Sequence, residues 1–281
     1  MNFTDWIGRT EVASDVVTAT PYAAMSAMLD LASERPSAGT PLPPLWHWLY
    51  FLPLARQSDI GADGHPKRGG FLPPVPLPRR MWAGSQFEFA HPLRVGDAIE
   101  RTSTVVDVTQ KSGRTGPLVF VKVKHEIRRN TESALALTEF HDIVYREAAR
   151  ADDPAPPPKP APATSAWERK WTPDDVLLFR YSALTFNGHR IHYDRRYVTE
   201  VEGYPGLIVH GPLIATLLLE LLRGHLPQAE VLRYEFRAVR PLFDINTFHT
   251  CGELQPGGKT IQLWVRDHEG FLAMSAMAVV R

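Results

Sequence analysis

A dense group of side chains that can exchange protons or bind metal ions lies in residues 184–194, LTFNGHRIHYD. It contains His189 and His192, with Asn187 before them and Asp194 after them. Because histidine changes charge near neutral pH and also binds metals, this density indicates either an acid/base site or a metal site. The spacing His-x-x-His-x-Asp matches no recognised metal geometry, and the chain has one cysteine, so we expect no metal.

A second segment, residues 204–213 with the sequence YPGLIVHGPL, leads into a strongly apolar stretch. His210, Gly211 and Pro212 are expected at the N-terminus of a helix, since proline is favoured in a first turn and glycine lets another group approach the backbone. The free N–H groups at such an end attract developing negative charge. The segment is therefore suited to be the oxyanion hole for an acyl-thioester carbonyl.

The elements that must position these residues form two similar halves. Residues 151–164 are proline-rich, and because proline lacks an N–H donor and favours extended backbone, we interpret them as a semi-rigid linker. It separates residues 1–150 from residues 165–281. The long segment 36–78 is rich in proline and glycine and is expected to be irregular, with the aromatic run 46–51 serving mainly in packing.

Each half has one helical stretch followed by segments in which apolar and polar residues alternate, as in half-buried strands. The helices are expected at residues 22–35 and 212–226, and the second is apolar nearly all round, so it must be buried on most faces. The alternating segments are 86–109, 117–128 and 134–146 in the first half, and 231–244, 260–268 and 271–281 in the second. A buried helix wrapped by an antiparallel sheet, present twice, is an α+β arrangement.

The composition excludes several classes of protein. Lys+Arg and Asp+Glu number 31 each, so there is no basic excess for binding nucleic acid. No run of about 18 apolar residues predicts a membrane span. The first residues, MNFTDWIGRTEVASD, are acidic where a signal peptide would be basic and then apolar, so we expect a cytoplasmic protein.

At this point two motifs together, LTFNGHRIHYD and then GLIVHGPLIATLL, resemble the MaoC-like, R-specific enoyl-thioester hydratases and dehydratases of the hotdog fold. The two-half layout is similar to the branch containing the type 2 hydroxyacyl-thioester dehydratases and the bacterial itaconyl-CoA and mesaconyl-C4-CoA hydratases. The resemblance covers essentially the whole chain. It implies a double hotdog, in which residues 1–150 form a degenerate hotdog domain with a proline-rich insertion and residues 165–281 form the catalytic one.

The hydratase motif of this family typically runs Asp-x-Asn-Pro-aliphatic-His, and its Asp and His together hold the reacting water. Matched residue by residue, the His falls on His192, the Asp on Asn187, the Asn on His189 and the Pro on Arg190. An amide cannot accept a proton at neutral pH, so the resemblance implies that His192 is the principal general base and acid. It also implies that Gly211 donates its N–H to the thioester oxygen.

Supporting roles are expected from neighbouring polar residues. Asp194 and His189 are both candidates for the second polar group of the site, and spacing does not choose between them. His210 is expected to be a turn residue whose side chain supports the site. Arginines could bind the free carboxylate of a dicarboxylic acyl group through their planar fork. The candidates are Arg79, Arg80 and Arg190 for this carboxylate, and Arg237 and Arg240 for the phosphates of CoA.

We therefore expect an acyl-CoA hydratase that adds water reversibly to an enoyl-CoA, with itaconyl-CoA or mesaconyl-C4-CoA as leading substrates and no metal or other cofactor. A 3-hydroxyacyl-thioester dehydratase of fatty-acid synthesis, a hotdog thioesterase and a non-catalytic acyl-thioester binding module are the alternatives. A thioesterase usually needs a carboxylate near the helix N-terminus, and Asn187 argues against it. Two hotdogs in one chain already form a pseudo-dimer, so a monomer and a homodimer both fit the sequence.

Overall fold

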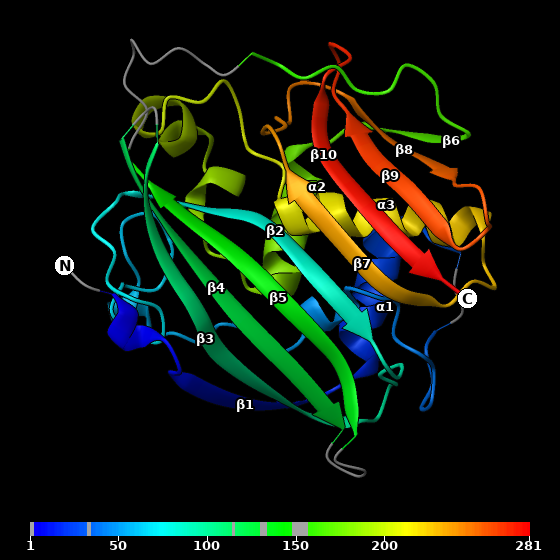
Figure 1. Cartoon of the computed structure of the whole chain (residues 1–281), viewed down its shortest axis with the longest axis horizontal. Helices are drawn as coiled ribbons and strands as arrows, with labels where there is room; N and C mark the ends of the chain where they lie inside the picture. Colours follow the sequence, from blue (N-terminus) through cyan, green and yellow to red (C-terminus); the bar gives the residue numbers. More distant parts are fainter. Residues whose placement is uncertain (1–2, 33–34, 114–115, 130–133, 148–156) are drawn as a thin grey trace.

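The strands of both halves join into one antiparallel sheet, shown from its broad side in Figure 1. The computed structural model describes residues 3–32, 35–113, 116–129, 134–147 and 157–281. Among these residues the strand order is β1-β3-β4-β5-β2-β7-β10-β9-β8-β6. The strands are β1 (Thr10–Val16), β2 (Arg79–Phe89), β3 (Ala98–Gly113), β4 (Gly116–Arg129), β5 (Leu135–Arg146), β6 (Trp167–Trp171), β7 (Val231–Ala238), β8 (Phe248–Leu254), β9 (Thr260–Arg266) and β10 (Leu272–Val280). The helices are α1 (Ala19–Met28), α2 (Asp175–Thr185) and α3 (Gly211–His225).

The two halves meet where β2 pairs with β7 in antiparallel register, Ser85 opposite Phe236 and Phe87 opposite Tyr234. Gly84 permits this contact, because a Cβ atom there would lie 2.4 Å from the carbonyl oxygen of Phe236. The two predicted sheets are therefore continuous through this seam. Residues Arg79 to Gly84, which include two of the candidate carboxylate ligands, belong to β2 itself.

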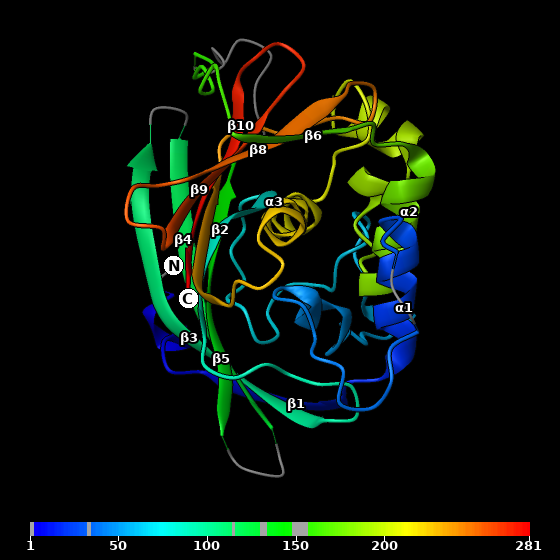
Figure 2. The ribbon, with the colours of Figure 1, turned by 90° about the vertical axis from the view of Figure 1, so that its right-hand side faces the viewer.

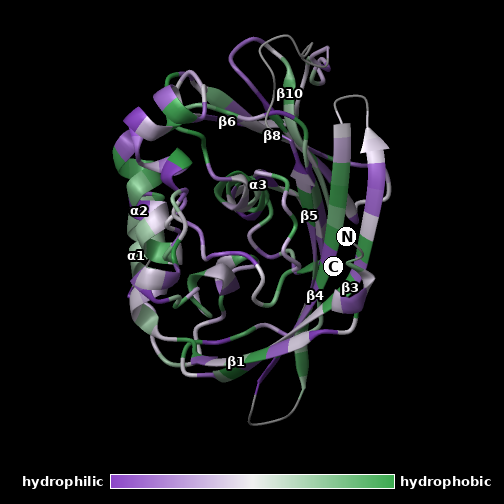
Figure 3. Ribbon diagram, turned by 90° about the vertical axis from the view of Figure 1, so that its left-hand side faces the viewer, coloured by the Kyte–Doolittle hydropathy of each residue, from purple (hydrophilic) through white to green (hydrophobic). Residues whose placement is uncertain are grey.

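The predicted helix of the second half is confirmed as α3, which lies between the sheet and an outer layer formed by α1 and α2 (Figures 2 and 3). Every residue from Leu213 to Leu222 is buried, as expected for a helix that is apolar nearly all round. Tyr234 on β7 donates a hydrogen bond of 3.1 Å from its hydroxyl to the carbonyl oxygen of Ala215. This bond and the surrounding leucines fix the helix on the sheet.

The helix predicted at residues 22–35 is misplaced in two respects. It runs from Ala19 to Met28, and it packs against α2 and the short 3-10 helix η2 (Trp46–Leu49) instead of lying at the centre of the first half. The segment around η2 takes the inner position, because the indole of Trp46 donates to Glu220 of α3 at 3.0 Å. His47 and Trp48 likewise bond the buried carboxylate of Glu139 on β5, each at 3.2 Å.

Further elements were not predicted from the sequence, namely β1, β6, β8 and α2. Residues 151–156 of the expected linker lie outside the described residues. The rest of the linker is held against the strands, since Ala161 donates its backbone N–H to Gly270 and Pro160 bridges Phe271. No described helix combines the length and apolar character needed to cross a membrane.

Candidate active site

The loop that carries the two histidines of LTFNGHRIHYD begins where α2 ends. Phe186 closes the helix in the left-handed backbone region, with φ of 49°. The side-chain oxygen of Asn187 then accepts the backbone N–H of His189 at 3.0 Å, which is an Asx turn. Asn187 therefore shapes the loop through its side-chain oxygen.

His192 lies in the 3-10 helix η4 (Arg190–His192) and is only 7% exposed. Its Nδ1 is 2.7 Å from the backbone oxygen of Ile208, so this nitrogen carries the proton and the neutral ring leaves Nε2 bare. No hydrogen bond to Nε2 is found among the described residues. Burial lowers the pKa of His192 to about 4, although the bond to Ile208 partly opposes this shift. At neutral pH the ring is thus a neutral proton acceptor.

His210 stacks on His192, with ring centroids 3.7 Å apart and planes inclined by 18°. It is fully buried, and its Nε2 lies 2.8 Å from the hydroxyl of Ser182 on α2. Burial and the neighbouring imidazoles hold the pKa of His210 well below its ordinary value. The expected supporting role thus has a geometric basis, because His210 connects His192 to the start of α3.

Gly211 follows His210 as the first residue of α3, where backbone N–H groups have no partner within the helix. A Cβ atom built on Gly211 would meet no other atom within 4 Å, so the space in front of this residue is open. The structure therefore brings the proton acceptor His192 and the helix N-terminus together through His210. This arrangement can remove a proton from one group and stabilise negative charge on another.

His189 connects the site to residues from the first half. Its ring meets His192 edge to face at 5.5 Å between centroids, and it lies 4.0 Å from the ring of His65. The Nδ1 of His65 is in turn 3.1 Å from a carboxylate oxygen of Asp63. We call His65, His189, His192 and His210 the histidine row. Burial lowers the pKa of His189 to about 2 and also lowers that of His65.

Backbone contacts hold the first-half loop on the site. Arg190 binds this loop through two hydrogen bonds. Its backbone N–H donates to the carbonyl oxygen of Asp63 at 2.9 Å, and its Nη1 donates to the carbonyl oxygen of Ala62 at 3.0 Å. A Cβ atom on Gly64 would lie 1.8 Å from the carbonyl oxygen of Gly188, so only glycine fits there. Asp63 and His65 were missed in the sequence, where an Asp-Gly-His triplet inside a glycine-rich segment was the only available signal.

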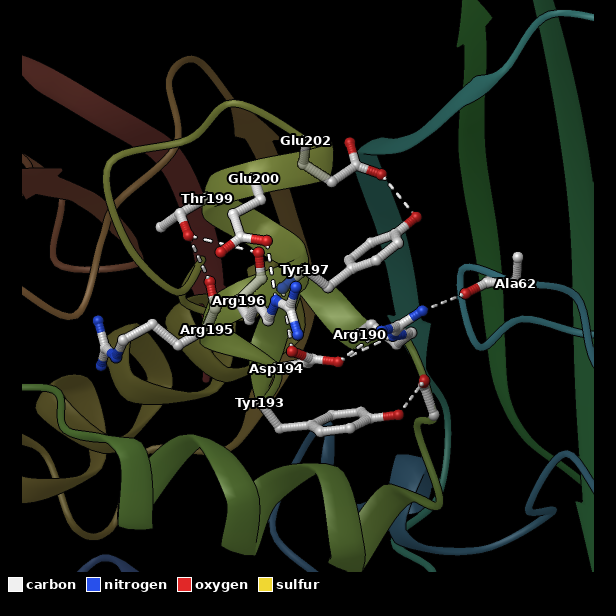
Figure 4. A network of polar contacts seen from close by, with 11 residues as sticks. Ala62, Arg190, Tyr193, Asp194, Arg195, Arg196, Tyr197, Thr199, Glu200 and Glu202 are labelled. Carbon is white, nitrogen blue, oxygen red and sulfur yellow. Dashed lines mark hydrogen bonds and ion pairs between the residues drawn. The ribbon is translucent and has the colours of Figure 1, made fainter.

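Asp194 and Arg190 pair with each other outside the histidine row (Figure 4). The Nη2 of Arg190 is 2.7 Å from Asp194, and its guanidinium lies 4.1 Å from the ring centre of Tyr197. The other oxygen of Asp194 accepts the backbone N–H of Tyr197 at 3.0 Å. Both residues are thus committed to holding the loop, which leaves His189 as the candidate in contact with His192.

Of the remaining candidate arginines, Arg80 is the one whose charge acts on the row. Its positive charge lowers the pKa of His65 and of His189, and it also acts on Tyr145 of β5. Among the described residues it has no ion-pair partner, whereas Arg79 forms an ion pair with Glu202. The charge of Arg80 is therefore not neutralised by a described carboxylate, although its side chain also hydrogen-bonds Tyr145.

The two arginines expected to bind the CoA phosphates lie outside the histidine row, and their role in CoA binding stays a prediction. Arg237 is exposed on the face of β7 opposite to α3, where it lines a hollow of about 640 Å³. Arg240 pairs with Asp267 at 2.8 Å and with Glu269 at 3.5 Å. The structure does not bring either guanidinium to the histidine row.

Among the described residues, two groups of side chains of the kinds that bind metal ions lie close together. Within each group the possible donor atoms lie within 4.8 Å of one another. One comprises Asp63, His65 and His189, and the other Asp267, His268 and Glu269. In the first group Asp63 is already bonded to both the ring and the backbone of His65, and Arg80 adds positive charge nearby. This favours an acid/base role for the group over a cation site.

Comparisons with known proteins agree with the motifs. Residues 45–244 match the family described as hydroxyacyl-thioester dehydratase type 2. The chain is 49% identical over 272 residues to the mesaconyl-C(4)-CoA hydratase of Chloroflexus aurantiacus, covering 96% of this chain and 95% of that protein.

Two solved structures have the same fold. A MaoC-like dehydratase from Phytophthora capsici has a TM-score of 0.69 and 13% identity, covering 100% of this chain and 98% of its own. A Mycobacterium tuberculosis protein described as a double hotdog has a TM-score of 0.59 and 16% identity, covering 100% and 98% of the two chains. The predicted α+β double hotdog is therefore confirmed.

Proposed function

Because the chain belongs to the hydroxyacyl-thioester dehydratase type 2 family, we propose that it is a hydro-lyase that adds water reversibly to an enoyl-CoA, with mesaconyl-C4-CoA as its substrate. The observation that carries the reaction type is the bare Nε2 of His192 beside the N-terminus of α3. The observation that favours this acyl group is the likeness to a relative named for it.

The reaction follows from the geometry of the site. His192 takes a proton from water at Nε2 while the water oxygen bonds to the β-carbon of the enoyl group. The electron pair of the double bond moves toward the thioester oxygen, where the N–H of Gly211 stabilises the charge. The imidazolium of His192 then returns the proton to the α-carbon, and the ring is neutral again.

Arg80 supports the choice of a dicarboxylic acyl group. In mesaconyl-C4-CoA the free carboxylate is bonded to the β-carbon, so a cation that binds it must lie near the groups that activate water. Arg80 meets this requirement, because its charge acts on His65 and His189 of the row. Of the three predicted carboxylate ligands, Arg79 and Arg190 are both held in ion pairs.

The test of this proposal is a substrate panel. Mesaconyl-C4-CoA, itaconyl-CoA and crotonyl-CoA would each be incubated with the enzyme, and loss of the enoyl-thioester absorbance would be followed. We expect fastest hydration of mesaconyl-C4-CoA. Faster turnover of crotonyl-CoA than of both dicarboxylic thioesters would contradict the assignment of the acyl group, and no hydration of any of them would contradict the reaction type.

The remaining expectations from the sequence stay predictions. They are catalysis without a metal or a further cofactor, a cytoplasmic location, and an oligomeric state for which the sequence fits both a monomer and a homodimer. The dehydratase and thioesterase alternatives use the same fold. A thioesterase mechanism usually needs a carboxylate, whereas Asn187 is an amide whose oxygen accepts the backbone N–H of His189.

A further inference from the structure

Hydration creates a positive charge on the buried ring of His192. When His192 takes the proton of water it becomes an imidazolium, and burial makes this form costly. A carboxylate beside the ring would offset the cost, but Asn187 stands where the family has one, and Asp194 is paired with Arg190. The histidine row therefore needs negative charge from elsewhere.

Asp63 is the carboxylate that bonds to the row among the described residues. Its Oδ2 is 3.1 Å from Nδ1 of His65, and its Oδ1 accepts the backbone N–H of the same residue at 3.0 Å. The rings of His65, His189 and His192 then follow at centroid distances of 4.0 and 5.5 Å. Because this buried region is weakly screened by water, the charge of Asp63 acts on His65 and His189, and the charge of His65 in turn acts on His192.

We propose that Asp63, contributed by the first half, is a positioning residue that supplies the negative charge for the proton in transit along the histidine row. This inference rests on the proposed hydratase function. In the hydration step the O–H bond of water breaks, the proton is held on the row, and the C–O bond forms at the β-carbon. The same proton then bonds to the α-carbon, so Asp63 stays ionised and the row returns to its starting charge.

The surroundings of Asp63 agree with this role. Burial alone would raise the pKa of its carboxyl group, but the hydrogen bonds from His65 outweigh burial and hold it below its usual range. Asp63 also opposes the lowering of the pKa of His65 and His189. The other charged or titratable groups near this end of the row are Arg68, Arg80, Arg190, His192 and Tyr197. Arg68 and Arg80 lower the pKa of His65, and Arg80 also lowers that of His189, whereas Arg190 is paired with Asp194. The negative charge of Asp63 opposes the effect of Arg68 and Arg80 on these rings.

The experiment compares Asp63→Asn, Asp63→Glu and His65→Gln with wild-type enzyme. Asp59→Asn is the matched control, because Asp59 is an exposed carboxylate in the same segment with no ion-pair partner among the described side chains. Hydration of mesaconyl-C4-CoA would be measured across the pH range, with kcat and KM determined separately. Wild-type activity is established first, so that failure of the hydratase assignment is seen before any variant is judged.

For Asp63→Asn we expect kcat to fall by about 100-fold, the low end of what acid/base catalysis contributes, with little change in KM. The acid limb of the pH profile should move to lower pH, because without Asp63 the imidazoles hold a proton less well. Asp63→Glu should recover part of kcat, His65→Gln should behave like Asp63→Asn, and Asp59→Asn should match wild type.

Two results would overturn the inference. One is a kinetic result against the role of Asp63. Either Asp63→Asn keeps the wild-type kcat, or its kcat falls while the acid limb of the pH profile stays in place and Asp63→Glu recovers no activity. The other is loss of wild-type activity on dialysis against a chelator, restored by a divalent metal, which would make Asp63 a metal ligand. If Asp63→Asn does not fold, His65→Gln and Asp63→Glu decide the question by the same pH profiles.

Discussion

Replacing Arg80 with glutamine is expected to remove the preference of the enzyme for a dicarboxylic acyl group. Arg80 is the predicted carboxylate ligand whose charge acts on His65 and His189, whereas Arg79 is paired with Glu202. The substitution keeps a polar side chain of similar length but removes the charge and the planar fork. Binding of the carboxylate next to the β-carbon should suffer, while water activation by the row should not.

The size of the effect follows from the bond that is lost. A hydrogen bond to a charged group contributes about 1.5–3 kcal/mol, and each 1.4 kcal/mol is about a factor of ten. The value of kcat/KM for mesaconyl-C4-CoA should therefore fall by about 10- to 100-fold. Crotonyl-CoA has no carboxylate to bind, so its kcat/KM should stay near the wild-type value or rise.

The assay is the loss of enoyl-thioester absorbance with both substrates, for wild type, Arg80→Gln and Arg180→Gln. Arg180 is the control, since it is an exposed arginine on α2 with no ion-pair partner among the described side chains. Its replacement should leave both substrates unaffected. An equal loss on mesaconyl-C4-CoA and crotonyl-CoA in Arg80→Gln would refute the reasoning, because it would mean that Arg80 serves the thioester or the fold and not the carboxylate.

Three further predictions concern the helix start, the loop and acid stability. Gly211→Ala should fold normally, because the added Cβ meets no atom within 4 Å. The variant should nevertheless have a lower kcat, because the methyl group obstructs the approach of the thioester oxygen. Melting curves test the first expectation and kinetics test the second. Asp194→Ala should lower the melting temperature by a few degrees, through loss of its bonds to Arg190 and the backbone of Tyr197, while changing kcat little. A large loss of kcat at unchanged stability would instead indicate that Asp194 takes part in catalysis. The melting temperature should also fall as pH drops from about 6.5 toward 4. Burial lowers the pKa of His125 and His192 to about 4 in the folded protein, so over this range the unfolded chain binds more protons than the folded one. An unchanged melting temperature over this range would contradict the buried neutral state of these histidines.

The sequence was most informative where local patterns act alone. The apolar helix that became α3 was predicted within one residue at each end, because its burial on all sides requires apolar residues all round. Family and fold were predicted from two short motifs and are confirmed by the comparisons. The first-half helix was misplaced because an apolar stretch fixes helix formation but not the partner, and α1 packs on α2.

The site was predictable on one side only. His192 and His189 share one motif, and Gly211 begins the helix that follows, so their proximity is local. Asp63 and His65 come from an irregular segment more distant in the chain, and they reach the row through backbone contacts that no periodicity reveals. The role of Asn187 likewise depends on a turn geometry that its residue type alone does not specify.

The most direct test of the central claim is to incubate wild-type enzyme and His192→Gln with mesaconyl-C4-CoA and follow enoyl absorbance and free CoA thiol together. We predict that wild type removes the absorbance without releasing thiol, and that His192→Gln loses this activity by about 100-fold or more while remaining folded. Thiol release by wild type without hydration, or unchanged hydration by His192→Gln, would contradict the assignment of His192 as the acid/base of a hydratase.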